Sequence, residues 1–232
     1  MTGLLAKSLN VGASTLAMRM GQQTFYQYMR AFGLGKPTGV DLQHEAAGIL
    51  ITRDKNPDQW SEAILASNSF GQGIATTPLQ MIAAVSAVAN DGVMVQPHVV
   101  KQIVRGDRVD AAKVVVTSRP ITKKTANTLT NMLVNAVSRE VTDAQVDGYT
   151  IAGKTGTAQI PIPGGYDDPW TIGSFIAFAP AEDPQVIILV KLDRPTSSMW
   201  GSETAVPVFH DLATRLFPVL GVRPSNQVAM NK

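Results

Sequence analysis

The sequence predicts an α+β fold in which an antiparallel sheet packs against helices, and three observations support this. Helical patterns dominate the first part of the 232-residue chain, three strand patterns occur together in the last third, and one more helical pattern follows them. The connections between the three strands are too short for a crossover helix, so we expect an antiparallel meander. Helices and strands that occupy separate parts of a chain are typical of α+β folds.

The first helical pattern covers residues 1–32, with a break expected near residues 9–12. Glycine and proline at residues 33–37 end it, because glycine suits a helix C-terminus and proline cannot continue a helix. Residues 38–59 are polar and rich in turn formers, which predicts a surface excursion. A glycine-bracketed turn at residues 69–73 follows.

The next helix has a clear start signal. Thr77 suits the N-cap, Pro78 the first helical position, and Gln80 completes a capping box. The helix runs to about Asn90 and is apolar on nearly every side, which is typical of a buried helix.

The remaining elements follow from their periodicity. Short β-type runs are expected at 99–104 and 113–116, separated by a polar turn at 106–108, and a helix over 122–139. The meander strands are expected at 149–159, 173–179 and 186–192, with loops at 161–169 and 179–184 and a closing helix over 204–216. We therefore divide the chain into a helical portion of about 1–140, a portion of about 141–220 with the sheet and terminal helix, and a flexible tail over 221–232.

Composition and charge exclude several functions. With 44% hydrophobic residues the chain is globular, and 20 Lys+Arg against 18 Asp+Glu argue against a nucleic-acid partner. The absence of cysteine excludes disulfides, thiolate nucleophiles and Cys-ligated zinc. The three histidines show no metal-ligand spacing, so we expect neither metal nor cofactor. No apolar run approaches the roughly 18 residues of a membrane span.

Two short motifs contain the residue types of a binding site. Lys154-Thr155-Gly156-Thr157 follows Gly153 in the first predicted strand, where glycine permits close approach of a ligand or another chain. A lysine beside two hydroxyls suits a carboxylate or a substrate aligned along the strand edge. An exposed strand with a solvated lysine explains the same tetrapeptide equally well. Ser8-Leu9-Asn10, taken alone, is more often a helix cap or turn.

Taken together and in order, the two motifs resemble those of the penicillin-binding proteins, specifically the class B transpeptidases of cell-wall synthesis. Ser8-Leu9-Asn10 is similar to the second motif of that family, and the strand that begins at Lys154 is similar to the third. Further segments are similar to the family as well: Phe70-Gly71-Gln72-Gly73, Thr77-Pro78-Leu79-Gln80, Phe178-Ala179-Pro180-Ala181 and Ala205-Val206-Pro207-Val208-Phe209.

The resemblance implies a penicillin-binding protein/β-lactamase-like transpeptidase fold and a D,D-transpeptidase that acts on the D-Ala-D-Ala end of peptidoglycan stem peptides. It assigns catalytic roles to Ser8 as a proton relay, to Asn10 as the group that orients the substrate amide and the general base, and to Lys154 as positive potential for the substrate carboxylate. Substrate binding falls to Thr155, Gly156, Thr157 and Gln159, with hydroxyl donors on both threonines. The N–H of Thr157 forms half of an oxyanion hole.

The first motif of the family, Ser-x-x-Lys, is missing from this sequence. No serine has a lysine three residues on, and Thr52-Arg53-Asp54-Lys55 is a chance match in a polar loop. Without a nucleophile and its base the covalent step is lost, so the chain alone is expected to be catalytically incompetent. Three explanations compete: an N-terminally incomplete fragment, which we favour, a diverged non-catalytic homologue, and a chain that a partner complements.

Two other functions stay open from the sequence. The alternative is a non-catalytic module of this fold that binds peptidoglycan peptides or a cell-wall partner. A different serine hydrolase is a weaker alternative, because no Gly-x-Ser-x-Gly motif is present.

The resemblance also implies a location and partners. It places the parent protein on the extracytoplasmic face of the bacterial cell membrane, in cell division or cell shape. Stem peptides, β-lactams and other cell-wall synthesis proteins are the implied partners, and truncation would add self-association through exposed core surface.

Overall fold

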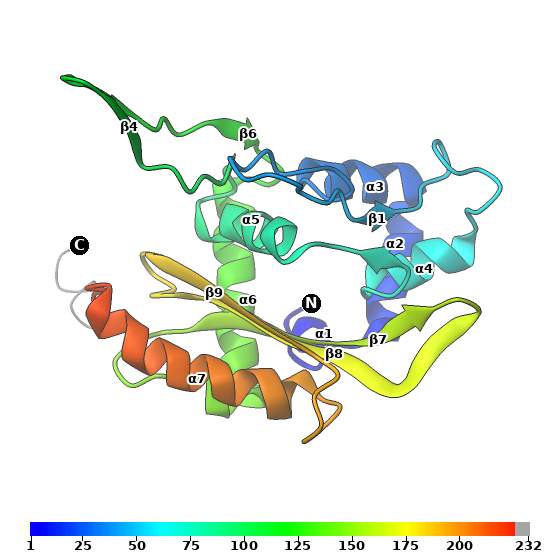
Figure 1. Cartoon of the computed structure of the whole chain (residues 1–232). Coiled ribbons are helices and arrows are strands. Elements are labelled where there is room, and N and C mark those ends of the chain that lie inside the picture. The colour runs from blue at the N-terminus through cyan, green and yellow to red at the C-terminus, as the bar shows by residue number, and fades with distance from the viewer. Residues whose placement is uncertain (226–232) are drawn as a thin grey trace.

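A computed structural model describes residues 1–225 and confirms the antiparallel meander (Figure 1). Its strands are β7 (Ala152–Ile162), β8 (Gly165–Ala179) and β9 (Val186–Asp193), hydrogen-bonded in the order β7-β8-β9. The closing helix α7 (Gly201–Val219) packs along β8 and β9. Helices before a sheet and one helix after it confirm the α+β class.

The main core lies between this sheet and α7. Phe175 of β8 contacts Phe209 of α7 edge to face, with ring centroids 4.8 Å apart, and Phe217 packs against Tyr149 at the same separation. Phe175, Phe209 and Phe217 are each at most 1% exposed. Burial of such rings is worth about 2–3 kcal/mol each, so this cluster holds β8 and α7 together.

The loop expected at 161–169 is strand instead. Ile162 pairs with Gly165, so β7 and β8 continue to a two-residue turn at Pro163 and Gly164. Gly164 has φ 86°, a conformation that short hairpin turns require and glycine adopts without strain. The density of proline and glycine indicated a loop, whereas these residues occupy the exposed end of a long hairpin.

The N-terminal helical region has three helices: α1 (Thr2–Ala6), α2 (Asn10–Met20) and α3 (Gln22–Ala31). The expected break lies slightly earlier, at residues 7–9, and a second break at Gly21 was not predicted. The end of α3 before Gly33 is confirmed, since Gly33 has φ 79°.

The helix predicted at Thr77 is confirmed with its capping box. In α5 (Pro78–Ala89) the Thr77 hydroxyl accepts from Gln80 N, and Gln80 Oε1 accepts from Thr77 N. The expectation of a buried helix is confirmed in part: no residue of 79–89 is exposed, but only Gln80, Ala83, Ala84 and Ala87 are fully buried. Gln80 is buried because its amide also donates to the carbonyl oxygens of Lys36 and Ala47 at 2.7 and 2.9 Å.

The structure adds short elements that the sequence patterns did not indicate. Helix α4 (Glu62–Ser69) begins at the N-cap Ser61, whose hydroxyl accepts from Ile64 N. The excursion at 38–59 contains β1 (Ile49–Leu50), which pairs with β2 (Ile74–Ala75). Helix α6 (Lys123–Glu140) is confirmed with Thr122 as its N-cap.

The strand runs expected between 99 and 116 are partly wrong. The hairpin consists of β4 (Gln102–Arg105) and β5 (Arg108–Ala111), while β6 (Val116–Ser118) pairs with β3 (Met94–Val95). Residues 99–101 and 113–115 are not strand, although they contain four valines. β propensity alone did not locate the strands, because no buried face fixes the register there.

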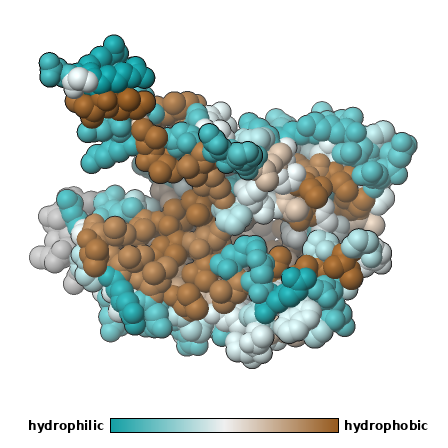
Figure 2. Space-filling model, in the orientation of Figure 1, coloured by the Kyte–Doolittle hydropathy of each residue, from teal (hydrophilic) through white to brown (hydrophobic). Residues whose placement is uncertain are grey.

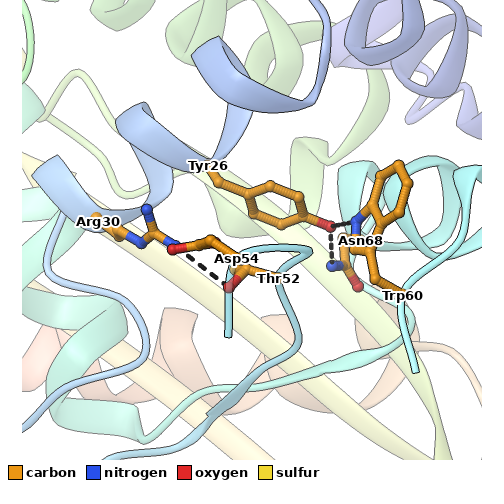
Figure 3. A network of polar contacts seen from close by, with 6 residues as sticks. All are labelled: Tyr26, Arg30, Thr52, Asp54, Trp60 and Asn68. Atoms are coloured by element: carbon orange, nitrogen blue, oxygen red, sulfur yellow. Dashed lines mark hydrogen bonds and ion pairs between the residues drawn. The ribbon is translucent and has the colours of Figure 1, made fainter. Parts of the chain in front are cut away.

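A polar network fastens α3 to residues 52–68 (Figure 3). The hydroxyl of Tyr26, a residue 3% exposed, accepts from Trp60 Nε1 at 3.0 Å and lies 3.1 Å from the Asn68 amide. Arg30 makes an ion pair with Asp54 at 2.6 Å. The Asn68 orientation that satisfies both ends of its amide accepts from Tyr26 and donates to Gly73 O at 3.1 Å. This network therefore also holds the turn that follows α4.

The first part of the expected tail packs against the domain. Val222 is 6% exposed and its carbonyl accepts from the Tyr149 hydroxyl, and Ser225 N donates to Gly148 O at 2.8 Å. The rest of that tail, 226–232, lies outside the described residues. Within residues 1–225, no helix is long and apolar enough to cross a membrane.

Candidate functional site

The structure brings the two sequence motifs together. The ammonium of Lys154 on β7 donates to Ser8 Oγ at 3.1 Å, between α1 and α2. It also donates to the carbonyl oxygen of Thr155 at 2.9 Å. Because the two residues are far apart in sequence, this contact depends on the tertiary fold and not on local structure.

Ser8 has an unusual backbone conformation. Its φ is 51°, in the left-handed region that glycine adopts most readily. Ser8 N donates to Leu5 O and Leu9 N to Leu4 O, so α1 ends in a Schellman motif with Ser8 at the position where glycine is usual. A non-glycine residue here costs about 1 kcal/mol. Such strain is concentrated at functional sites, and the hydroxyl of Ser8 accepts the hydrogen bond from Lys154.

The charge of Lys154 is only partly solvated. Burial lowers the pKa of Lys154 below that of an ordinary lysine. Its hydrogen-bond partners, Ser8 Oγ, Thr155 O and Thr155 Oγ1, are all uncharged. Over residues 1–225, Lys154 forms no ion pair with a carboxylate. A half-buried cation with neutral partners is a favourable place for an anion.

Strand β7 lies at an edge of the sheet, with β8 on its other side. The alternate backbone N–H groups of an edge strand point away from the sheet and can pair with an extended ligand. Thr157 and Gln159 lie on this strand and are exposed, whereas Thr155 is half-buried. Asn10 is exposed at the start of α2, two residues after Ser8.

The absence of a side chain at Gly153 is explained by packing within the domain. This corrects the expectation that glycine here permits close approach of a ligand or another chain. A Cβ at Gly153 would lie 2.7 Å from both Ala177 Cβ and Phe175 Cζ. The residue is buried. Glycine here therefore lets the β8 side chains pack under the site.

The N-terminus of α7 meets β7 at the third motif. Gly201 N donates to Thr157 Oγ1 at 2.9 Å, and a Cβ at Gly201 would lie 2.3 Å from Gly156 O. Since Thr157 Oγ1 accepts this bond, its proton remains available to a ligand. The first turn of α7, which carries Glu203, thus meets the strand at Thr157. The role of Gly201 was missed from sequence, because its position at the strand becomes apparent only in the fold.

No metal site accompanies these residues in the described part of the chain. Groups of three or more His, Asp or Glu side chains that could hold a metal ion are absent from residues 1–225. The arrangement can hold an anion, donate hydrogen bonds from hydroxyls and pair with an extended backbone.

Comparison with known proteins gives a consistent result. Residues 1–214 match the family model described as penicillin binding protein transpeptidase domain. The chain is 40% identical over 233 residues to penicillin-binding protein PbpB of Mycolicibacterium smegmatis, which covers 93% of this chain and 35% of that protein. It is 36% identical to stage V sporulation protein D of Bacillus subtilis, covering 97% of this chain and 35% of that protein.

A solved structure agrees in fold. Penicillin binding protein 3 from Mycobacterium tuberculosis in complex with ampicillin superposes with a TM-score of 0.87 at 36% identity, over 97% of this chain and 52% of that one. The same protein in complex with aztreonam gives a TM-score of 0.86. The chain spans about a third of the length of these curated relatives, as the 35% coverage of two of them shows.

Proposed function

The chain belongs to the penicillin binding protein transpeptidase domain family, and we propose that its Ser8–Lys154 site binds the terminal carboxylate of a D-Ala-D-Ala stem peptide. The observation that carries this proposal is the half-buried Lys154 ammonium, whose partners are all neutral. A peptide carboxylate supplies the missing counter-charge, and charge-assisted hydrogen bonds are about twice as strong as neutral ones.

The neighbouring groups complete the binding of the peptide. Ser8 Oγ accepts from Lys154, so its own proton can be donated to the ligand, and Thr157 is in the same situation. The peptide extends along the free edge of β7 towards Gln159. The N–H of Thr157 is the donor for the carbonyl of the D-Ala-D-Ala bond, and Asn10 orients the peptide amide.

We propose that these 232 residues bind without forming an acyl-enzyme. Acyl transfer needs a serine nucleophile with an adjacent base, and no Ser-x-x-Lys occurs in this sequence. Removal of the nucleophile leaves only the contribution of binding and of the oxyanion donors. The non-catalytic peptide-binding module is the second candidate, favoured by the same Ser8–Lys154 site in a sequence that has no Ser-x-x-Lys nucleophile.

For the whole protein we propose D,D-transpeptidase activity in peptidoglycan synthesis at the extracytoplasmic face of the cell membrane. The relatives named penicillin-binding protein and stage V sporulation protein D support a role in cell division or cell shape. Because ampicillin and aztreonam are bound by the Mycobacterium tuberculosis protein, we include β-lactams among the ligands, together with other cell-wall synthesis proteins.

Binding of the peptide carboxylate is tested by a change in the ligand. An acyl-D-Ala-D-Ala peptide with a free carboxylate should bind at least about tenfold more tightly than the same peptide ending in a carboxamide, because only the first pairs with Lys154. Isothermal titration calorimetry measures both affinities. Equal affinities would show that the carboxylate does not reach a cation.

As the pH is raised, the peptide affinity should begin to fall at a lower pH than it would if Lys154 had the pKa of a surface lysine. Only the ammonium form of Lys154 pairs with a carboxylate, and burial lowers its pKa. In the same pH window the unfolded chain binds more protons than the folded one, so the contribution of Lys154 to the free energy of unfolding rises with pH. Titrations and thermal melts from pH 7 upwards, with Lys154→Met as the reference, check both signs. Affinity that stays flat until the pH range of an ordinary lysine would contradict this.

A further inference from the structure

A second exposed feature lies far from the Lys154 site. Residues 99–116, here called the arm, carry the β4–β5 hairpin away from the body of the domain (Figure 1). Figure 2 shows apolar surface along this arm and hydrophilic surface at its tip. Its aliphatic side chains are 41–75% exposed: Val99, Val100, Ile103, Val104, Val109, Val114, Val115 and Val116. Apolar surface that is gathered in this way marks an interaction site more often than scattered residues do.

The base of the arm is held firmly. The carboxylate of Asp41 accepts from Val99 N at 2.7 Å and from Val100 N at 2.8 Å. The hydrogen bond from Val99 N, and after it the one from Val100 N, lowers the pKa of Asp41. The Asp41 carboxylate that holds the base of the arm is therefore charged at neutral pH. Gln96 N also donates to Val115 O at 2.9 Å. A fixed base presents the hairpin in a defined direction.

The hairpin has two different faces. Val104 is paired with Val109, so this face is aliphatic. Arg105 is paired with Arg108 and Ile103 with Asp110, so the other face is mainly cationic. Side chains alternate between the faces of a strand, which places Arg105 and Ile103 on the same face.

The arginine pair is unfavourable by itself. Like charges directly opposite each other destabilise a hairpin. Arg108 is partly compensated by Asp110, with Nε 2.8 Å from Oδ1. Arg105 has no ion pair in the part of the chain that the structure describes. An anionic group beside Arg105 would relieve the repulsion.

Both edges of the hairpin are available, because β4 and β5 form a sheet of two strands. A third strand can add its backbone hydrogen bonds to such an edge. Charge selects the β4 edge: an acidic residue there meets Arg105, whereas beside β5 it meets Asp110 as well. We propose that the β4 edge binds an extended segment of a partner protein in which acidic and aliphatic residues alternate.

The other occupants fit less well. A second copy of this chain would bring its own arginine pair against Arg105. The arm contains no Phe, Tyr or Trp, the residues that favour the membrane interface. A strand in which acidic and aliphatic residues alternate matches both faces of the hairpin. Its acidic side chains lie beside Arg105 on the cationic face, and its aliphatic side chains lie beside Val104 on the aliphatic face.

The test uses a capped octapeptide of alternating Val and Glu and its Val and Lys counterpart. Fluorescence anisotropy should show binding of the Glu peptide only. Arg105→Gln should weaken it about tenfold, as for loss of one charge-assisted hydrogen bond, and more than Arg108→Gln does. Arg215→Gln on α7 is the matched control and should have no effect. Hydrogen exchange should show protection of β4 amides when the peptide is added.

Several results would overturn the proposal. These are no binding of the Glu peptide, equal binding of the Lys peptide, or full affinity in Arg105→Gln. Binding of phosphatidylglycerol vesicles that Val104→Ser abolishes would assign the arm to a lipid surface instead. Dimerisation in sedimentation velocity that Arg105→Gln abolishes would assign it to a second copy. Thermal melts of each variant verify that the fold is kept.

Discussion

Replacement of Lys154 by alanine should lower the affinity for an acyl-D-Ala-D-Ala peptide by about tenfold to a hundredfold. The ammonium of Lys154 lies between Ser8 and β7, where it donates to Ser8 Oγ and to Thr155 O. A hydrogen bond to a charged group contributes about 1.5–3 kcal/mol, which corresponds to that range of affinity. Calorimetric titration of wild type and variant measures the ratio.

The control for this experiment is Lys191→Ala. Lys191 lies on β9, where it forms an ion pair with Asp193, so its removal should leave peptide affinity unchanged. Lys154→Arg should recover part of the affinity, because it keeps the charge but not the shape of an ammonium. If Lys154→Ala bound the peptide as tightly as wild type, the carboxylate would not bind at this site.

Gly201→Ala should destabilise the domain by about 3 kcal/mol and weaken peptide binding at the same time. An added Cβ would lie 2.3 Å from Gly156 O and 2.9 Å from Ser174 N, and backbone atoms cannot give way as a flexible side chain can. Overpacking of this kind costs about 1–3 kcal/mol or more. A shift of α7 also breaks its bond to Thr157, so the strand that binds the ligand moves.

Thermal unfolding checks this prediction. In a domain of this size, 3 kcal/mol lowers Tm by roughly 10 °C. Gly165→Ala is the control, since no atom outside its chain neighbours lies within 4 Å of its added Cβ; Gly165 lies in β8, the strand that contacts α7. An unchanged Tm for Gly201→Ala would mean that α7 can move away from β7 without loss of packing.

The parts of the fold that sequence predicts well are those with a strong local signal. The capping box at Thr77 and the apolar periodicity over 122–139 locate two helices correctly. The strand patterns likewise locate β9 and the buried second half of β8, where Phe175 and Val190 belong to the core with α7, but they miss the exposed first half of β8. In the arm, where both faces are exposed, valines extend beyond the strands and the same pattern misplaces their bounds.

The candidate site was predictable in its composition but not in its geometry. The motifs name Ser8 and Lys154. Their 3.1 Å contact, however, joins residues that are 146 positions apart in the sequence, so only the tertiary fold shows it. The left-handed conformation of Ser8 has no sequence signal, since it arises from the junction of α1 and α2. The role of Gly201 likewise has no sequence signal, because it depends on the contact of the N-terminus of α7 with Gly156 and Thr157 of β7.

The central claim is that this chain binds peptide carboxylates and β-lactams at Lys154 without covalent chemistry. Its most direct test is incubation of the 232-residue chain with ampicillin, followed by intact-mass measurement and by competition with the acyl-D-Ala-D-Ala peptide. We expect an unchanged mass together with displacement of the peptide. A mass increase by one ampicillin would contradict the claim, because it requires a nucleophile that these residues are proposed to lack.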